Sequence, residues 1–338
     1  MTYIKQVKAR FIVPLLIISC LFFSCDKEKH DRKINFYYWK TVVDFGETEK
    51  KYFDKLNSKK LYIRLFDVDL EPDGFPTPKA KIKLFDPKEL KAEYIPVVFI
   101  TNRTFTDMKY WNTESLARSI NEMIDKIIEK NNIPASNEIQ IDCDWTTTSR
   151  DDYFLFLKEL RMISGKDITC TLRLHQVKDK ELAGIPPVDK AYLMCYATTS
   201  PNDKNTQNSI LDIELLKNYT KDINKYPLNL DIALPLYSWG VVTNHRGEIK
   251  LINNVDINSF VPDYFKEIGP NTYEAIDDFF LQGIYLNKGF TLRIERINPE
   301  LLNEAKDYLD KKMNKQYNIV YYHLDKPFLE RFSFEELR

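Results

Sequence analysis

The chain has 338 residues, with 49 Lys and Arg against 50 Asp and Glu, a formal net charge of -1 and 13% aromatic residues. Acids and bases are interspersed, so the sequence offers no basic face for a nucleic acid, and no nucleic-acid partner is expected. About 310 residues follow an N-terminal leader, a length that α/β barrels use as one domain. No internal repeat divides them.

The N-terminal segment has the features of a secretory leader. Lys5, Lys8 and Arg10 precede an apolar run over residues 11–23, which is short for a membrane span but fits a signal-peptide core. The run ends in F-F-S-C, which resembles the lipobox of bacterial lipoproteins and makes Cys25 the expected lipidation site. We therefore expect a signal peptide over residues 1–24.

A second cysteine, Cys20 in I-I-S-C, is an alternative lipidation site. Cys25 is favoured because a polar stretch follows it directly, so that residues 25–33 would form a tether. The run D-K-E-K-H-D resembles the surface-export signal of some Bacteroidota lipoproteins. We expect a lipid-anchored protein of the cell envelope, at the periplasmic or surface face of the outer membrane. An uncleaved anchor and ordinary secretion are the alternatives.

Apolar strand patterns then recur along the chain, and most are followed by a helical pattern. Strands that alternate with helices favour a parallel sheet, and eight strands are the number in a (β/α)8 barrel. We predict the α/β class and a (β/α)8 TIM barrel as a single domain over residues 34–338. The predicted strands are 34–39, 61–69, 95–101, 138–145, 168–175, 191–196, 230–237 and 318–325.

The clearest helix is predicted over residues 113–131, where an apolar stripe recurs at helical spacing and Thr113 is the expected N-cap. Residues 71–91 contain four prolines and are predicted to be loop in place of the second helix. In the helix over 299–313, Asn298 is the expected cap and Pro299 the first helical residue. The remaining helices are predicted at 48–56, 150–163 and 210–224.

An α+β insertion is predicted between the seventh and eighth strands, at about residues 240–316. We expect a hairpin over 241–252, a short helix over 273–281 and a further strand over 290–297. This insertion is expected to pack over one side of the barrel mouth.

The fourth strand, E-I-Q-I-D-C-D-W-T, alternates polar and apolar residues. Residues two apart on a strand share a face, and the apolar set suits packing against helices. Asp142 and Asp144 are therefore expected in the barrel lumen at the C-terminal strand ends, where chemistry gathers in such barrels. They are the catalytic candidates. Trp145 has the opposite parity and is expected to face the helices.

Buried carboxylates need compensating cations or donors. Arg173 and His175 on the fifth strand, and Arg64 on the second, are expected to supply them. Such a lumen is either a structural ion network or a site with shifted carboxyl pKa values. Glycoside hydrolysis needs two carboxyl groups. The partner of Asp142 and Asp144 could come from another strand, and four residues are candidates for it. These candidates are Asp67, Asp69, Glu295 and Asp325.

Aromatic residues lie at several predicted strand ends, where their rings could stack on sugar faces. Trp39, Tyr196, Tyr237 and Trp239 are the candidates for substrate binding, together with His323. His175 and His323 could also bind a metal, but metal-ligand spacing is lacking, and no metal or cofactor is expected. The three remaining cysteines are expected to be buried free thiols. They are Cys143, Cys170 and Cys195.

Three short motifs resemble those of the family 18 chitinase-like glycosidases. I-D-C-D-W-T resembles the end of that family's D-x-x-D-x-D-x-E strand, M-C-Y its M-x-Y, and L-P-L-Y-S-W its P-x-Y stretch. An α+β insertion follows the seventh strand there too. The resemblance implies that Asp142 and Asp144 match the inner aspartates of the motif, and that Tyr196 and Tyr237 match two tyrosines of the sixth and seventh strands.

The departures from that family bear on activity. Thr146 stands at the position of the family's catalytic Glu, Ile139 replaces the first Asp of the motif, and Ala197 replaces the Asp after the sixth-strand tyrosine. A threonine cannot protonate a glycosidic oxygen, so the substrate-assisted chitinase mechanism is not expected. The chain also resembles a group of uncharacterised Bacteroidota lipoproteins with an I-D-x-D-W-T strand.

The sequence thus predicts a glycoside hydrolase-like envelope lipoprotein that acts on a polysaccharide or oligosaccharide. Two alternatives are open: a carbohydrate-binding pseudoenzyme without catalytic activity, and a structural envelope lipoprotein whose polar lumen braces the barrel. The expected partners are a glycan and, through the lipid anchor, a membrane. The oligomeric state is left open.

Overall fold

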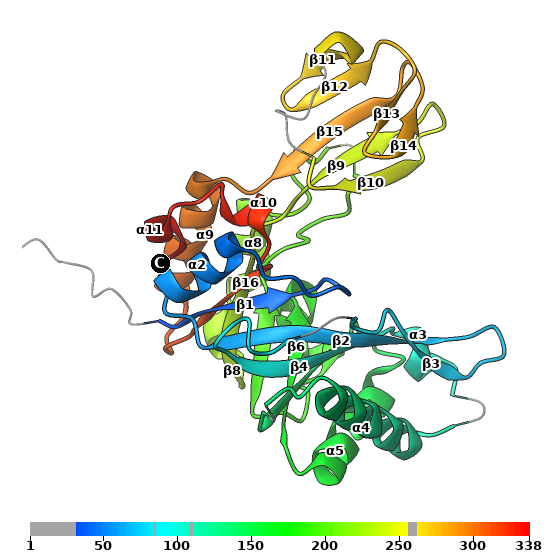
Figure 1. Cartoon of the computed structure of the whole chain (residues 1–338), viewed down its shortest axis with the longest axis vertical. Helices are drawn as coiled ribbons and strands as arrows, with labels where there is room; N and C mark the ends of the chain where they lie inside the picture. The colour runs from blue at the N-terminus through cyan, green and yellow to red at the C-terminus, as the bar shows by residue number, and fades with distance from the viewer. Residues whose placement is uncertain (1–31, 84–85, 109–110, 135, 204, 256–261) are drawn as a thin grey trace, which may run out of the picture. The chain divides into compact units, whose positions relative to one another are not determined.

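Eight parallel strands form a closed barrel, as the sequence predicts (Figure 1). The computed structural model describes residues 32–83, 86–108, 111–134, 136–203, 205–255 and 262–338, so the predicted signal peptide, Cys20 and Cys25 lie outside the described residues. Strand β1 pairs with both β16 and β2, which closes the ring. The barrel strands are β1 (Ile34–Tyr38), β2 (Lys60–Leu70), β4 (Glu93–Ile100), β5 (Glu138–Asp142), β6 (Asp167–Arg173), β7 (Lys190–Met194), β8 (Asn229–Pro235) and β16 (Ile319–Tyr322).

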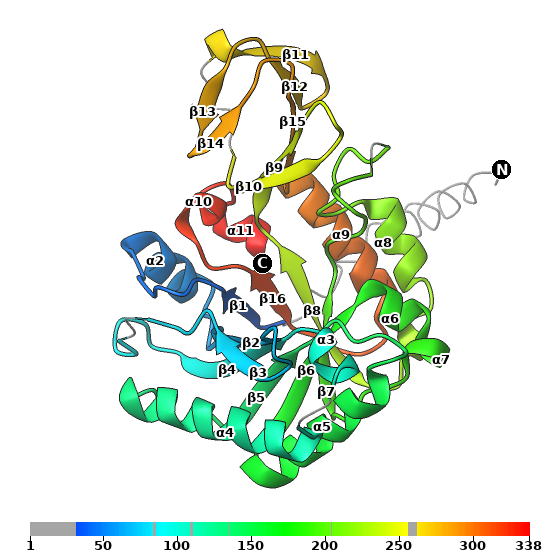
Figure 2. The same ribbon diagram turned by 90° about the vertical axis from the view of Figure 1, so that its right-hand side faces the viewer.

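Helices surround this barrel and pack their apolar stripes on it (Figure 2). Asn298 caps α9 as expected, because its side chain accepts a hydrogen bond from Leu301 N at 2.8 Å. The expected cap of α4 is wrong by one residue, since Asn112 accepts from Ser115 N and Thr113 is already helical. The helices are α2 (Glu47–Lys55), α3 (Arg103–Thr106), α4 (Thr113–Lys130), α5 (Arg150–Ser164), α6 (Leu174–Lys178), α7 (Lys180–Ala183), α8 (Ile213–Thr220), α9 (Pro299–Lys312), α10 (Lys326–Leu329) and α11 (Phe334–Leu337).

A hairpin takes the place of the second helix, among the residues described between β2 and β4. Strand β2 pairs along its last four residues with the antiparallel strand β3 (Pro76–Lys79). Pro76 and Pro78 are compatible with this position because β3 is an edge strand, where an N–H is not needed on the open side. The proline-rich loop of the prediction is therefore partly a strand.

The insertion contains a five-stranded antiparallel sheet, ordered β10-β9-β15-β12-β11, and a separate hairpin. It has its own apolar core. The sheet strands are β9 (Ser238–Thr243), β10 (Ile249–Asn253), β11 (Phe265–Gly269), β12 (Thr272–Ala275) and β15 (Thr291–Arg296), and the hairpin is β13 (Phe279–Leu281) with β14 (Ile284–Leu286).

The short helix predicted over residues 273–281 is wrong. Tyr273 and Ala275 are buried while the residues between and before them are half-buried, which is the alternation of a strand. Pairing of β12 with β11 and β15 outweighs the local helical pattern. Helix α9, within the predicted range of the insertion, buries Leu302 and Leu309 in the barrel core.

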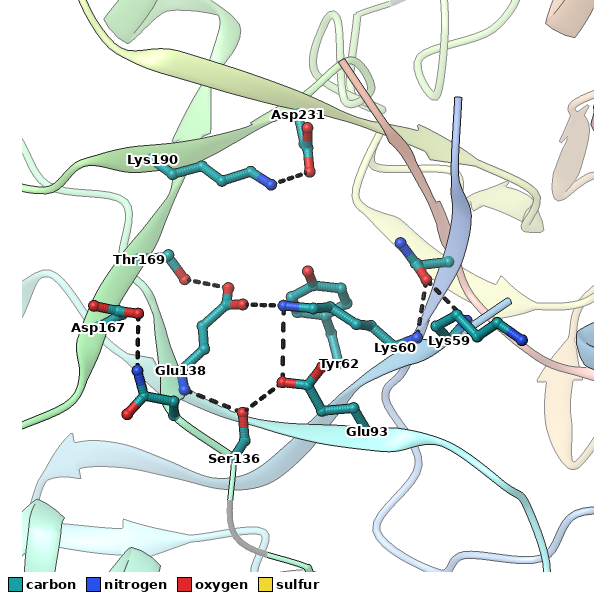
Figure 3. Close-up of polar contacts among 12 residues, drawn as sticks. Lys59, Lys60, Tyr62, Glu93, Ser136, Glu138, Asp167, Thr169, Lys190 and Asp231 are labelled. Atoms are coloured by element: carbon teal, nitrogen blue, oxygen red, sulfur yellow. Dashed lines mark hydrogen bonds and ion pairs between the residues drawn. The ribbon is translucent and has the colours of Figure 1, made fainter. Parts of the chain in front are cut away.

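At the N-terminal end of the barrel, a polar network fills the lumen (Figure 3). Glu138 accepts a hydrogen bond from Lys60 Nζ at 2.8 Å, from Thr169 Oγ1 at 3.0 Å and from the Tyr192 hydroxyl at 2.9 Å. The hydroxyls of Tyr62 and Tyr192 are 2.7 Å apart. These partners offset the desolvation of a buried carboxylate, and this end of such barrels serves stability.

No helix among the described residues is long and apolar enough to cross a membrane.

Candidate active site

A cavity of about 560 Å³ opens at the C-terminal ends of the barrel strands. Its walls come from the ends of β1, β6, β7, β8 and β16, and from two neighbouring strands of the insertion. Pockets that combine aromatic walls with a few polar groups are typical ligand sites. The lining residues are Trp39, Lys40, Arg173, Tyr196, Ala197, Tyr237, Ser238, Trp239, Asn253, Asn254, Tyr322, His323, Asp325 and Phe328.

Tyr322 lies at the centre of the aromatic lining. Its ring centroid is 5.7 Å from those of Trp39 and Tyr237, and 5.6 Å from that of Tyr196. The Tyr237 ring in turn meets Trp239 edge-on at 5.3 Å. Because these rings pack on one another, each restricts the rotamers of the next, so the aromatic walls are preorganised.

Asp144 is held at the edge of this cavity by Arg173. The guanidinium donates from Nε to Oδ1 at 2.5 Å and from Nη2 to Oδ2 at 2.9 Å. Such a fork fixes the plane of the carboxylate. Arg173 lines the cavity, while the side chain of Asp144 remains 42% exposed. The expected pairing between the fourth-strand acids and Arg173 is therefore present.

Asp142 is buried below this ion pair, in the lumen. Its Oδ1 accepts a hydrogen bond from Thr171 Oγ1 at 2.6 Å. Burial raises the pKa of Asp142 to about 6; Arg173 and Thr171 oppose this shift, and the charge of Asp144 adds to it. Asp142 is thus a carboxyl group that changes its protonation near neutral pH, although it does not line the cavity.

A second ion pair lies on the opposite wall. Lys40 Nζ and Asp325 Oδ1 are 2.5 Å apart, with Lys40 more exposed than its partner. His323 lies next to this pair, and its Nδ1 is buried without a hydrogen-bond partner among the described residues. Burial lowers the pKa of His323 to about 4, so that the imidazole is neutral at physiological pH.

Glu295, expected to contact substrate, is instead a buried support for Trp239. Its Oε2 accepts from Trp239 Nε1 at 2.8 Å, and also from the backbone N and hydroxyl of Ser209 at 2.8 and 2.5 Å. Arg293 donates to the other oxygen at 2.8 Å. The carboxylate is 1% exposed, and it joins β15, the loop after β7 and a cavity wall.

Asp67 and Asp69 of β2 also lie outside the cavity lining. Asp69 is bound by the exposed Arg103 through two hydrogen bonds of 2.6 and 2.5 Å, and these lower the pKa of Asp69 to about 2. Asp67 is 3.4 Å from Arg64 Nη1, and burial raises its pKa. Arg64 lies over the ring of Trp39 at 5.6 Å, so it connects Asp67 to a residue of the cavity lining.

The placement of His175 in the lumen is wrong. Strand β6 ends at Arg173, and α6 begins at Leu174, which leaves His175 exposed on the first turn of a helix. Gln176 is the cause of this early end: its side chain accepts from Arg173 N at 2.8 Å and donates to the Trp145 carbonyl at 3.1 Å. The turn is stabilised by this contact between α6 and the loop after β5.

Thr146 is exposed in the turn that leads to α5. Its backbone N donates to Ser149 Oγ at 2.9 Å, and its hydroxyl lies 2.9 Å from that of Thr148. The chain thus has a helix-entry turn at Thr146. Trp145 packs against α5 as parity predicts, with its ring stacked on Tyr153 at 5.1 Å.

Several lining residues were not expected from the sequence. Tyr322 could have been predicted, because successive residues of a strand face opposite sides. The preceding Tyr321 points outward, where its hydroxyl donates to the carbonyl of Leu337 in α11. Asn253 and Asn254 carry no such signal, because they enter the site from the insertion. Ala197 has a left-handed backbone with φ of 53°. The others are Lys40, Ser238 and Phe328.

The three cysteines are free and buried, as expected. Burial raises the pKa of each thiol, which disfavours the reactive thiolate. No group of three or more His, Cys, Asp or Glu side chains is placed to hold a metal in the part of the chain that the structure describes.

Comparison with known structures identifies the fold. The spore cortex-lytic enzyme SleL of Bacillus cereus matches with a TM-score of 0.55 and 14% identity, over 90% of this chain and 73% of that one. A chitinase of Chromobacterium violaceum matches with 0.54 and 11%, over 90% and 98%. A mutant class V chitinase of Nicotiana tobaccum, solved in complex with NAG4, matches with 0.52 and 10%, over 90% and 98%.

The chain therefore has a (β/α)8 fold similar to that of these chitinases and of the spore cortex-lytic enzyme. At these identities the likeness concerns the fold alone, and the function must be argued from the site. No protein-family model and no curated protein sequence matches the chain.

Proposed function

We propose that this glycoside hydrolase-like protein binds an oligosaccharide in the cavity at the C-terminal end of its barrel. The observation that carries the proposal is the set of packed aromatic rings around Tyr322, with Trp39 and Trp239 half-buried on the cavity walls. Flat apolar rings suit the C–H faces of sugars, and the two ion pairs and two asparagines of the lining suit hydroxyl groups.

Binding without cleavage is supported by the state of the acidic groups. Both oxygens of Asp144 accept hydrogen bonds from the Arg173 fork, so the carboxylate is already engaged within the protein. Thr146 has no acidic proton to give, and it belongs to the turn before α5. Asp325 lines the cavity but is paired with Lys40. These three features favour a carbohydrate-binding pseudoenzyme.

Hydrolysis is a second candidate, and one observation favours it. The pKa of Asp142 is raised to about 6, a value suited to a group that must change protonation during a reaction. In such a reaction Asp142 would tune Asp144, which is the more exposed of the two and the better candidate to meet a sugar.

Two measurements on the wild type decide between these candidates. Binding to a glycan array without sugar release from the bound glycans would support the pseudoenzyme, whereas release that Asp144→Asn abolishes would support the hydrolase. Trp39→Ala should weaken array binding at least tenfold, and the matched control Met162→Ala, an exposed apolar residue on α5, should leave it unchanged. Absence of any glycan binding would leave the structural-lipoprotein alternative.

We also propose anchoring at the cell envelope through a lipid on Cys25, with an outer-membrane location. The support is the leader composition and the cysteine at its end. Cys25→Ala should release the protein from the membrane fraction, and Cys20→Ala should not. The reverse result would assign the lipid to Cys20, and retention of both variants would exclude a lipid anchor.

A further inference from the structure

The hairpin of β13 and β14 carries an exposed aromatic pair. Phe280 and Tyr285 are direct cross-strand neighbours, and their ring centroids are 5.0 Å apart. Phe280 is 70% exposed and Tyr285 47% exposed. Both rings lie on the outer face of the hairpin, since the residues that alternate with them, Leu281 and Leu286, are buried in the core of the insertion.

The rings are held in place by the hairpin beneath them. Leu281 and Leu286 anchor both strands, and the turn between the strands has a left-handed backbone at Gln282 and Gly283, which suits a tight hairpin. The Tyr285 hydroxyl donates to Asp278 Oδ2 at 3.0 Å. Phe280 and Tyr285 are thus held with their rings exposed to solvent.

A chain of contacts links this hairpin to the cavity wall. Trp239 of the cavity wall is the cross-strand neighbour of Asn253 on β10. Asn253 and the next residue, Asn254, line the cavity. The Gln282 side chain at the hairpin tip donates from Nε2 to the Asn254 carbonyl at 3.2 Å. Phe280 lies two strand residues from that tip, about 7 Å along the strand.

We propose that Phe280 and Tyr285 form an outer subsite for a glycan chain whose other part lies in the cavity. The inference rests on the proposed glycan binding and extends it, because it assigns the ligand class as an oligosaccharide long enough to reach the hairpin. The path from the cavity presents an aromatic ring, then amide side chains at Asn253 and Gln282, then a second aromatic surface.

The composition of this surface favours a glycan over a second copy of the chain. Carboxylate and amide groups flank the rings at Asp278 and Gln282, so polar atoms interrupt the apolar area. Apolar protein interfaces of useful stability need a larger continuous surface. Stacking of sugar rings on the pair requires only the two exposed faces and hydroxyl partners beside them.

The test compares short and long ligands on an array that carries matched series of β-linked oligosaccharides, each as a disaccharide and a hexasaccharide. For the series that the wild type binds, it should bind the hexasaccharide at least tenfold more tightly. The double variant Phe280→Ala and Tyr285→Ala should lose that difference and keep its affinity for the disaccharide. Trp39→Ala should weaken both.

Ile268→Ala is the matched control. Ile268 is an exposed apolar residue of the same insertion, on the edge strand β11 at the far side of the sheet from β10. It should leave both affinities unchanged. Equal binding of short and long ligands by the wild type, or an unchanged hexasaccharide affinity in the double variant, would overturn the outer subsite while leaving cavity binding intact. Binding to no series would overturn the proposed function itself, and the subsite with it.

Discussion

Arg173 and Asp144 form a two-point ion pair, with Nε to Oδ1 at 2.5 Å and Nη2 to Oδ2 at 2.9 Å, across the boundary between the lumen and the cavity. Arg173 lines the cavity, whereas Asp142 lies deeper in the lumen. Arg173 therefore connects Asp144 directly to the lining of the cavity. The pair therefore links the stability of the lumen to the shape of the site.

We predict a modest coupling energy for this pair. A double-mutant cycle of Arg173→Gln and Asp144→Asn should give about 1 kcal/mol in the free energy of unfolding, because the half-exposed carboxylate is screened by solvent. Urea unfolding of the four proteins measures it. A coupling of zero would mean that the two side chains do not hold each other in solution.

The buried carboxyl of Asp142 should make stability depend on pH. Its pKa in the folded protein, about 6, is above the ordinary value of 3.8, so its contribution is fully present below pH 3.8 and is lost as the pH rises through 6. The loss amounts to about 3 kcal/mol for a shift of this size. Urea unfolding between pH 4 and 7 should show this slope in the wild type and lose it in Asp142→Asn.

His323 changes the free energy of unfolding in the opposite direction over part of this pH range. Its pKa is lowered to about 4, so its stabilising contribution is present above pH 6.5 and is lost as the pH falls through 4. Both wild type and Asp142→Asn contain His323, so its contribution cancels in the difference between their free energies of unfolding. A difference that does not vary with pH would contradict the raised pKa of Asp142.

Glu295 should affect glycan binding without touching the glycan. Glu295→Ala removes the acceptor of Trp239, Ser209 and Arg293, and it should cost about 3 kcal/mol of stability because the half-buried Arg293 loses its ion pair and the buried donors lose their partner. Glu295→Gln keeps the shape and one acceptor oxygen, and should cost less. Urea unfolding and array binding of both variants give the comparison.

The matched variant for this experiment is Trp239→Phe, which keeps an aromatic wall and removes the hydrogen bond. If Glu295 acts by positioning Trp239, both Glu295→Ala and Trp239→Phe should weaken array binding. Normal glycan affinity in a folded Glu295→Ala protein would show that Trp239 holds its place without the carboxylate.

The polar network around Glu138, at the N-terminal end of the barrel, should serve stability alone. Glu138→Leu leaves Lys60, Thr169 and Tyr192 without their acceptor and should lower the free energy of unfolding by about 2–4 kcal/mol. Glycan affinity should not change, because the residues of the cavity lie at the other strand ends. A folded variant with altered glycan affinity would contradict this separation.

The fold was largely predictable because inward-facing and outward-facing residues alternate along its strands. Alternation along the fourth strand placed Asp142 in the lumen and Trp145 against a helix, and both positions are confirmed. Eight such strands defined the barrel. Periodicity of two residues is a property of the local backbone, so it can be read without knowledge of distant contacts.

The site was predictable only where it depends on that periodicity. The turn that ends β6 before His175 depends on hydrogen bonds that join Gln176 of α6 to Arg173 and to the loop after β5, and Asn253 reaches the cavity from an insertion with its own core. Glu295 looked like a ligand-binding acid, and only the tertiary structure shows that donors from Ser209, Trp239 and Arg293 already bind it. Contacts between distant segments cannot be inferred from the local pattern of polar and apolar residues.

The left-handed backbone at Ala197 has a consequence for the redesign of this site. Alanine is strained at a φ of 53°, whereas aspartate and asparagine tolerate this region better than other residues with a Cβ. Because Ala197 lines the cavity, exchange of this one side chain would place a new polar group in the site at little cost to the main chain.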